Sequence, residues 1–238
     1  VYPSALALPK PITFRNAAIT AGRASLTSAM PSFRAGVSLL ASVSWFGIEA
    51  RHTNPLTDIV VIAGANCVLD GSRVLGDTVN GAKRGIAGNA PNVTVVRCYV
   101  DDIKGQTTDP DTQAFCAWDS PGPFLIDDNF LCAGSETILF GGADPSTPAN
   151  VPANIVVTNN TITKQPGMLK VKNLVEFKNE RTYRVENNDL SHCWGPEQGG
   201  YAIMITPRNQ DGTAPYSEVR NGTIRNNRIA HVGAVLSL

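Results

Sequence analysis

The sequence predicts an all-β solenoid, a chain wound into stacked coils, and three observations indicate this class. A hexamer with the pattern apolar, polar, polar, Asn, any residue, apolar recurs along the chain. Short runs rich in Val and Ile recur between the hexamers and are bounded by Gly, Pro and Asn, which is typical of strands and turns. No segment keeps a helical apolar period over a dozen residues, so helices are expected to be nearly absent.

The hexamers fix the length of one coil. They read IDDNFL, VTNNTI, VENNDL and IRNNRI, and their fourth residues are Asn129, Asn160, Asn188 and Asn227. Further upstream, Cys98, Gly71 and Phe46 take the same place in the alignment. A repeat of roughly 30 residues is typical of a solenoid, and the alignment predicts about seven coils.

The hexamer also predicts a bend. Its first and sixth residues, such as Ile126 and Leu131, are both apolar and both need to face the core. In a straight strand, residues five positions apart point to opposite faces, so the chain must turn sharply between them. Asn tolerates the left-handed conformation that such a bend needs. Stacked coils then place Asn over Asn, and the side-chain amides are expected to form a hydrogen-bonded ladder.

Composition excludes several classes of protein. Hydrophobic residues make up 42% of the 238 residues, which is enough for a continuous core. Twenty Lys and Arg balance twenty Asp and Glu, so the chain lacks the basic surface of a nucleic-acid binder. No apolar stretch reaches the roughly 18 residues of a transmembrane helix. The five cysteines form no CxxC or metal-binding spacing and are expected to be mostly buried thiols.

Longer strings resemble a known family. GDTVNGAKRGIAGN (76–89) and NLVEFKNERTYRVENN (173–188) are similar to right-handed parallel β-helix repeat proteins of the pectate-lyase type, found in environmental bacteria and phage-like sequences. The resemblance implies three short parallel sheets, with the Asn ladder at the bend between the second and third strands. It also implies an extracellular, periplasmic or virion-surface location.

The sequence predicts two regions. Residues 1–40 are expected to form an extended segment or a first irregular coil, and residues 41–238 the parallel β-helix. The last apolar run, AVLSL, resembles a first strand without its successors. Because an open coil exposes its core and strand edges, truncation is expected, or closure by a second copy or a larger assembly.

Candidate site residues follow the first strand of each coil. If Val175 and Phe177 point inward, Glu176 and Lys178 point outward on one face. Trp118, Asp119, Asp144 and Arg208 follow first strands of other coils, and together these residues are expected to line a shallow polar groove. The other interpretation is that Glu176 and Lys178 form an ordinary solvated pair.

The family resemblance adds a catalytic hypothesis. Similarity to β-helix lyases of uronic-acid polysaccharides implies Lys178 as the base and Arg208 as the assisting cation. It implies Glu176, with Glu136 or Asn129, as ligands of Ca²⁺, the only cofactor that the sequence suggests.

A second candidate site lies in SHCWGPEQGGY. His192 and Trp194 are expected on a loop after a third strand, where the indole could stack on a sugar near the acid Glu197. Ordinary loop packing is the alternative interpretation, and no role is predicted for His52 or His231.

Three functions remain open at this stage. The first is a β-helix of an extracellular surface or virion that binds an extended polysaccharide along its outer groove. The second is a non-catalytic structural subunit of a larger assembly. The third is a Ca²⁺-assisted polysaccharide lyase, or failing that a glycoside hydrolase. Nucleic acid is not expected as a partner.

Overall fold

The protein is nearly all-β. The computed structural model describes residues 6–8, 13–14, 32–33, 37–39, 42, 44–52, 58–105, 111–195, 197–209 and 211–238. Within these residues the only helical element is the short 3-10 helix η1 (Pro148–Asn150). The described residues therefore contain no helix that could cross a membrane.

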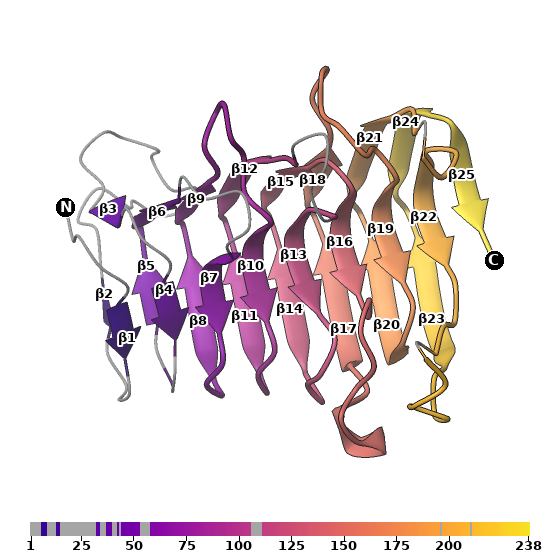
Figure 1. Ribbon diagram of the computed structural model, residues 1–238, viewed down its shortest axis with the longest axis horizontal. Helices are drawn as coiled ribbons and strands as arrows, with labels where there is room; N and C mark the ends of the chain where they lie inside the picture. Colours follow the sequence, from indigo (N-terminus) through magenta and orange to yellow (C-terminus); the bar gives the residue numbers. More distant parts are fainter. Residues whose placement is uncertain are drawn as a thin grey trace.

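Three parallel sheets run the length of the molecule, and each coil adds one strand to each sheet (Figure 1). The first sheet contains β1 (Leu6–Leu8), β4 (Val37–Leu39), β7 (Asp58–Ile62), β10 (Arg84–Gly88), β13 (Gln113–Ala117), β16 (Glu136–Phe140), β19 (Asn173–Phe177), β22 (Tyr201–Ile205) and β25 (Ala234–Ser237). The second sheet contains β2 (Thr13–Phe14), β5 (Ser44–Phe46), β8 (Cys67–Asp70), β11 (Val93–Val96), β14 (Phe124–Asp127), β17 (Ala153–Thr158), β20 (Glu180–Glu186) and β23 (Val219–Arg225). The third sheet contains β3 (Ser32–Phe33), β6 (Glu49–Arg51), β9 (Arg73–Leu75), β12 (Tyr99–Ile103), β15 (Phe130–Ala133), β18 (Thr161–Thr163), β21 (Asp189–Cys193) and β24 (Arg228–Val232).

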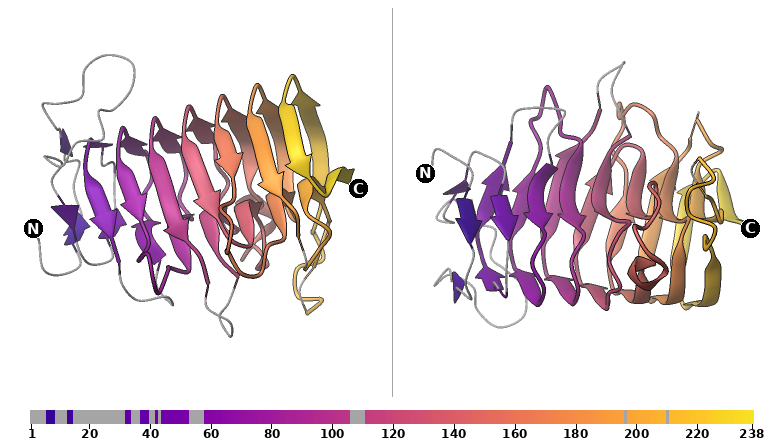
Figure 2. Two further views of the ribbon diagram at one scale, coloured as in Figure 1. Left: turned by 90° about the horizontal axis from the view of Figure 1, so that it is seen from above. Right: turned by 60° about the horizontal axis from the view of Figure 1, so that its bottom comes forward.

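This winding confirms the predicted right-handed parallel β-helix. The apolar runs 84–88, 173–177 and 201–205 coincide with β10, β19 and β22. Strands of neighbouring coils pair in parallel, and Figure 2 shows the coils stacked along one axis. The described strands make eight coils and the first strand of a ninth, one coil more than predicted, because β1, β2 and β3 precede the first unit recognised in the sequence.

The interior is a continuous apolar column. Val175 and Phe177 are fully buried, as the alternation in NLVEF predicts. Aromatic rings stack from coil to coil, with ring centroids 5.7 Å apart for Phe115 and Phe140 and 5.9 Å apart for Phe140 and Phe177. All five cysteines are free and buried, which confirms their role as small apolar fillers.

The Asn ladder is present at the bend between the second and third sheets. Asn129 Nδ2 donates to Asn160 Oδ1 over 2.9 Å, and Asn160 Nδ2 donates to Asn188 Oδ1 over 3.0 Å. Asn188 Nδ2 continues the row with a bond of 2.9 Å to Asn227 Oδ1. Each Oδ1 also accepts the main-chain N–H of the residue in the coil before it, as between Asn160 and Asn129 at 2.9 Å. The ladder prediction is confirmed.

Two upstream members of the ladder column differ from the prediction. Cys98 takes its predicted place, because its main-chain N–H donates to Asn129 Oδ1 over 2.8 Å. The next two places belong to Ser72 and Ile48, not to Gly71 and Phe46: Tyr99 N donates to Ser72 O, and Arg73 N to Ile48 O. Without an Asn to mark the column, the alignment slipped by one residue at Gly71 and by two at Phe46.

The left-handed bend residue is the one before each ladder Asn. Positive φ values occur at Asp128 (52°), Asn159 (56°), Asn187 (57°) and Asn226 (56°). The prediction that the ladder Asn itself adopts this conformation was therefore wrong. The turn is made one position earlier, and the ladder Asn keeps its side chain between the coils, where it pairs along the axis.

Candidate functional site

A row of polar side chains starts three neighbouring strands of the first sheet. Gln113, Glu136 and Asn173 are the first residues of β13, β16 and β19, and all three are at most 2% exposed. Gln113 Nε2 donates to Glu136 Oε2 over 2.8 Å. The row belongs to the outer face of the sheet, yet it is shielded from solvent.

Glu176, the predicted outward carboxylate, is the centre of a small buried network. Lys178 Nζ lies 3.3 Å from its Oε1, and Asn173 Nδ2 donates to its Oε2 over 2.9 Å. Thr206 Oγ1 donates to Oε1 over 3.3 Å. Burial raises the pKa of Glu176, the Lys178 ammonium opposes this, and the charge of Glu136 adds to it. The predicted pair exists, but its carboxylate is buried and its lysine is half-buried, so it is not an ordinary solvated pair.

Glu136 is paired with a second lysine. Lys172 Nζ lies 3.3 Å from Glu136 Oε1 and also contacts the Asp111 carboxylate. Burial lowers the pKa of Lys172, but the two carboxylates outweigh burial and raise it overall. The buried carboxylates Glu136 and Glu176 therefore each have their own ammonium partner.

The residues present do not fit the predicted calcium site. Ca²⁺ takes six to eight oxygen ligands, and here ammonium groups lie against Glu136 and Glu176. The described residues contain no group of three or more His, Cys, Asp or Glu that could hold a metal ion. Asn129, the other suggested ligand, uses its amide in the ladder.

The row keeps two oxygen atoms without hydrogen-bond partners, Gln113 Oε1 and Asn173 Oδ1. The third oxygen of the row, Glu136 Oε1, has only the Lys172 ammonium beside it, at 3.3 Å. Buried polar groups are nearly always hydrogen-bonded, so two such acceptors in one row are unusual. Ordered water is the simplest donor that could satisfy them.

Lys178 and Arg208 lie beside each other on neighbouring coils. Arg208 N donates to Lys178 O over 3.0 Å at the end of the first sheet, while Thr206, whose N–H donates to Phe177 O, lies beside Lys178 in its column. Trp118 lies in the same column two coils earlier, since Gly141 N donates to Ala117 O and Lys178 N to Phe140 O. The Arg84 guanidinium carbon lies 4.9 Å from the Trp118 ring centroid, so a cation already covers this ring.

The predicted acids Asp119 and Asp144 hold the loops between the first and second sheets. Asp119 Oδ1 accepts bonds from the N–H and the hydroxyl of Ser146, at 2.8 and 2.9 Å. Asp144 Oδ2 accepts from Thr213 Oγ1 over 2.7 Å. The loop 206–218 thereby reaches the loop 141–152 across the short turn 178–179.

The second predicted site differs from its expectation. His192 lies within β21, not on a loop, because the third strand of that coil runs to Cys193. Its ring stacks on His231 of the next coil, with centroids 5.0 Å apart, a partner that the sequence did not suggest. Trp194 is 46% exposed and Glu197 is also exposed, and a sugar-stacking role for them stays a prediction.

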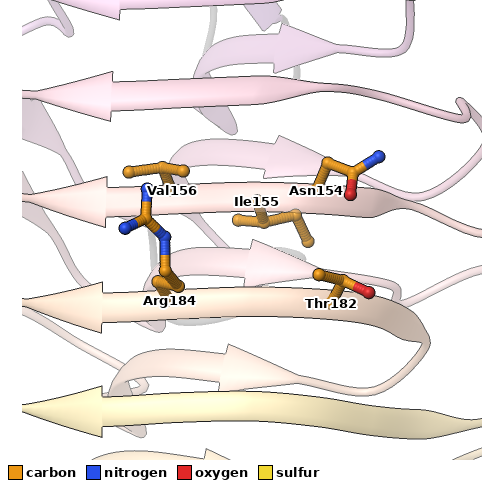
Figure 3. A pocket seen from close by; sticks show the side chains of 5 residues that line it. All are labelled: Asn154, Ile155, Val156, Thr182 and Arg184. Carbon is orange, nitrogen blue, oxygen red and sulfur yellow. The ribbon is translucent and has the colours of Figure 1, made fainter.

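A surface hollow lies on a different sheet from the one predicted. It lies on the outer face of the second sheet, between β17 and β20, has a volume of about 210 Å³ and is lined by Asn154, Ile155, Val156, Thr182 and Arg184. Figure 3 shows Arg184 reaching toward Val156 at one end, with Asn154 and Thr182 side by side at the other. The predicted site residues do not include it, because they follow the first strands of the coils. The alternation in RTYRV, which turns Arg184 outward, was the available signal.

Fold and site together define a solenoid with polar outer faces. A solved structure of similar fold is known. The chain is similar to the crystal structure of the Dettilon tailspike protein (gp208), with a TM-score of 0.58 and 13% identity. The similarity covers 94% of this chain and 42% of the tailspike chain. No family model matches the sequence, and no curated protein matches it. At this identity the likeness concerns the fold, the parallel β-helix.

Proposed function

We propose that this protein is an extracellular or virion-associated β-helix that binds an extended polysaccharide along its outer surface. The observation that carries the proposal is the parallel stacking of the coils: polar residues that follow first-sheet strands, such as Lys178 and Arg208, lie on neighbouring coils, and neighbouring strands are about 4.8 Å apart. A surface with polar groups on successive coils suits a linear polymer, which can contact several coils at once. The likeness in fold to a phage tailspike supports the virion association.

The binding surface would include the exposed groups near the ends of the first-sheet strands. Arg208 is exposed and lies next to Lys178, and Trp194 offers a half-exposed ring at the other end of these strands. Many weak contacts of this kind add up along a polymer. Since a fold alone does not determine function, these residues and not the β-helix decide the proposal.

A glycan panel tests the proposal directly. The full chain is applied to immobilised neutral and anionic polysaccharides, and the variants Arg208→Ala and Trp194→Ala are compared with it. Retention on at least one polysaccharide, reduced severalfold by either substitution, is the expected result. Retention on none would contradict the proposal.

The lyase hypothesis is tested with the same material. Incubation with a uronic-acid polymer would yield an unsaturated product that absorbs ultraviolet light if Lys178 acts as a base. Lys178→Ala would abolish that signal. Glycan binding without product would leave the protein a binding module.

A further inference from the structure

The hollow on the second sheet has one charged group at its edge. Arg184 is 53% exposed, and its nearest carboxylate is Glu186, with Nη1 and Oε2 3.8 Å apart. Glu186 is already closely paired, because Arg225 Nε lies 3.0 Å from its other oxygen. The Arg184 guanidinium therefore keeps most of its donors directed to solvent over the hollow.

Positive charge is concentrated on this part of the sheet. The outward side chains of β20 and β23 and the residue before β23 comprise four arginines and two carboxylates: Arg181, Arg184, Arg220, Arg225, Glu186 and Glu218. In the earlier coils, Asp70 and Asp127 are the charged residues of β8 and β14, and Arg97, next to β11, pairs with Asp70. The excess of arginines on this sheet is therefore found at β20 and β23.

The other lining residues offer hydrogen bonds to hydroxyl groups. Asn154 and Thr182 are exposed at the end of the hollow opposite Arg184, on neighbouring strands. Both have positive φ, near 55°. A volume of about 210 Å³ is below the roughly 300–1,000 Å³ of small-molecule pockets, so the hollow suits one ring of a longer ligand and not a whole small molecule.

We propose that this hollow is a subsite for a carboxylate-bearing sugar, so that the polysaccharide of the proposed function is an anionic, uronate-containing chain. The inference rests on that proposed function and names the class of its ligand. Arg184 binds the carboxylate, because a guanidinium matches a carboxylate with two parallel hydrogen bonds. Asn154 and Thr182 bind hydroxyl groups of the same chain.

The chemistry favours a polysaccharide over a nucleic acid. Single-stranded nucleic acids bind through stacked aromatic side chains, and no aromatic residue is among those that line the hollow. Duplex binding needs many basic contacts, whereas the chain has a net formal charge of zero.

Titration calorimetry with a soluble oligouronate tests the subsite. A cello-oligosaccharide of the same length serves as the neutral probe, and Arg184→Gln is compared with Arg228→Gln. The control removes one exposed charge from the third sheet, where Arg228 is 71% exposed and its Nη1 lies 2.8 Å from Asp189. The oligouronate should bind in preference to the neutral probe, and Arg184→Gln should weaken it about tenfold, while Arg228→Gln leaves it within twofold. Added salt should weaken binding by screening.

Each of the other outcomes contradicts one part of the proposal. Oligouronate binding that Arg184→Gln does not change would overturn the subsite and leave the proposed function standing. Equal binding of the neutral probe would overturn the anionic class alone. Absence of binding to either probe and to the glycan panel would overturn both. Thr182→Ala, which keeps every charge, should weaken binding a few-fold and provides a second variant if Arg184→Gln unfolds.

Discussion

Two buried polar rows run along this β-helix, and they differ in how their hydrogen bonds are satisfied. In the ladder, Asn129, Asn160 and Asn188 each donate and accept along the axis. In the outer row of the first sheet, Gln113 and its neighbours differ in type, and the side-chain oxygens of Gln113 and Asn173 lack partners. Identical amides satisfy one another's hydrogen bonds in any number of coils. In a row of unlike side chains, the hydrogen bonds depend on the groups that cover the row.

The difference separates scaffold from candidate site. A fully satisfied row stabilises the coils and repeats in sequence, because each coil needs the same residue. The outer row, with its unpaired acceptors and nearby ammonium groups, is confined to a few coils and does not repeat along the sequence. Substitutions in the two rows should therefore have unequal effects on stability.

The largest effect is expected at the centre of the ladder. Asn160→Ala removes both acceptor bonds of Oδ1 and the Nδ2 bonds to Asn188 and to the Ile126 carbonyl. Several buried partners then lose their bonds at 1–3 kcal/mol each, so urea denaturation should show a loss of about 4 kcal/mol. Asn159→Gly is the matched control: it keeps the left-handed turn, loses one exposed bond to Asp127, and should cost no more than about 0.5 kcal/mol. Equal losses for the two variants would show that the ladder is not stabilising.

A second large effect is expected at the corner between the third and first sheets. Lys164 Nζ is buried and donates to the carbonyls of Ala133, Gly134 and Ser135, at 3.0, 2.9 and 2.6 Å. Lys164→Met removes these three bonds, although Ser135 O still accepts from Lys172 N and Asn173 N, and should cost about 3 kcal/mol at neutral pH.

The same lysine predicts a pH dependence. Burial lowers the pKa of Lys164 to about 8, from the usual 10.5. The folded protein therefore loses this proton before the unfolded chain does, so the stability of the wild type should rise between about pH 8 and 10.5. Lys164→Met should lack this rise, and a rise of equal size in the variant would contradict the assignment.

A smaller effect is expected at Glu180, where stability should fall as the pH rises, opposite to the dependence at Lys164. Its side chain is fully buried, its Oε2 accepts from Asn179 N over 3.0 Å, and burial raises its pKa well above the usual value. A raised folded pKa means that its contribution is complete below about pH 4.5 and is lost as pH rises through the folded value. Glu180→Gln should therefore gain stability relative to the wild type as the pH rises above about 4.5, and thermal unfolding at a series of pH values measures this gain. A difference independent of pH would rule out this titration.

The smallest effect is expected at Glu176, which is hydrogen-bonded to Asn173 of the outer row. Glu176→Gln removes the ion pair with Lys178 but keeps an acceptor for Asn173. Its cost in urea denaturation should be about 1 kcal/mol, well below that of Asn160→Ala. A loss as large as the ladder variant's would mean that the outer row is also part of the scaffold.

The sequence predicts the repeating parts of the molecule better than the unique ones. Asn129, Asn160, Asn188 and Asn227 recur with fixed apolar neighbours, so the ladder and the fold follow from the pattern. The column was misplaced at Gly71, where no Asn marks it. For the candidate site, the Glu176–Lys178 pair follows from alternation within one strand.

The remaining site features depend on contacts between distant residues. Lys172 reaches Glu136 and Asp111 from other coils, and no local pattern indicates these contacts. The partnership of His192 with His231 depends equally on register between coils. Such contacts become visible only after the coils are stacked.

The central claim is that identical amides bind one another along one corner, and side-chain amide hydrogen exchange measured by NMR tests it most directly. The carboxamide protons of Asn129, Asn160 and Asn188 should exchange far more slowly than that of Asn159, whose amide is exposed. Exchange of the ladder amides at the rate of Asn159 would contradict the stacking, and with it the register of every outer row.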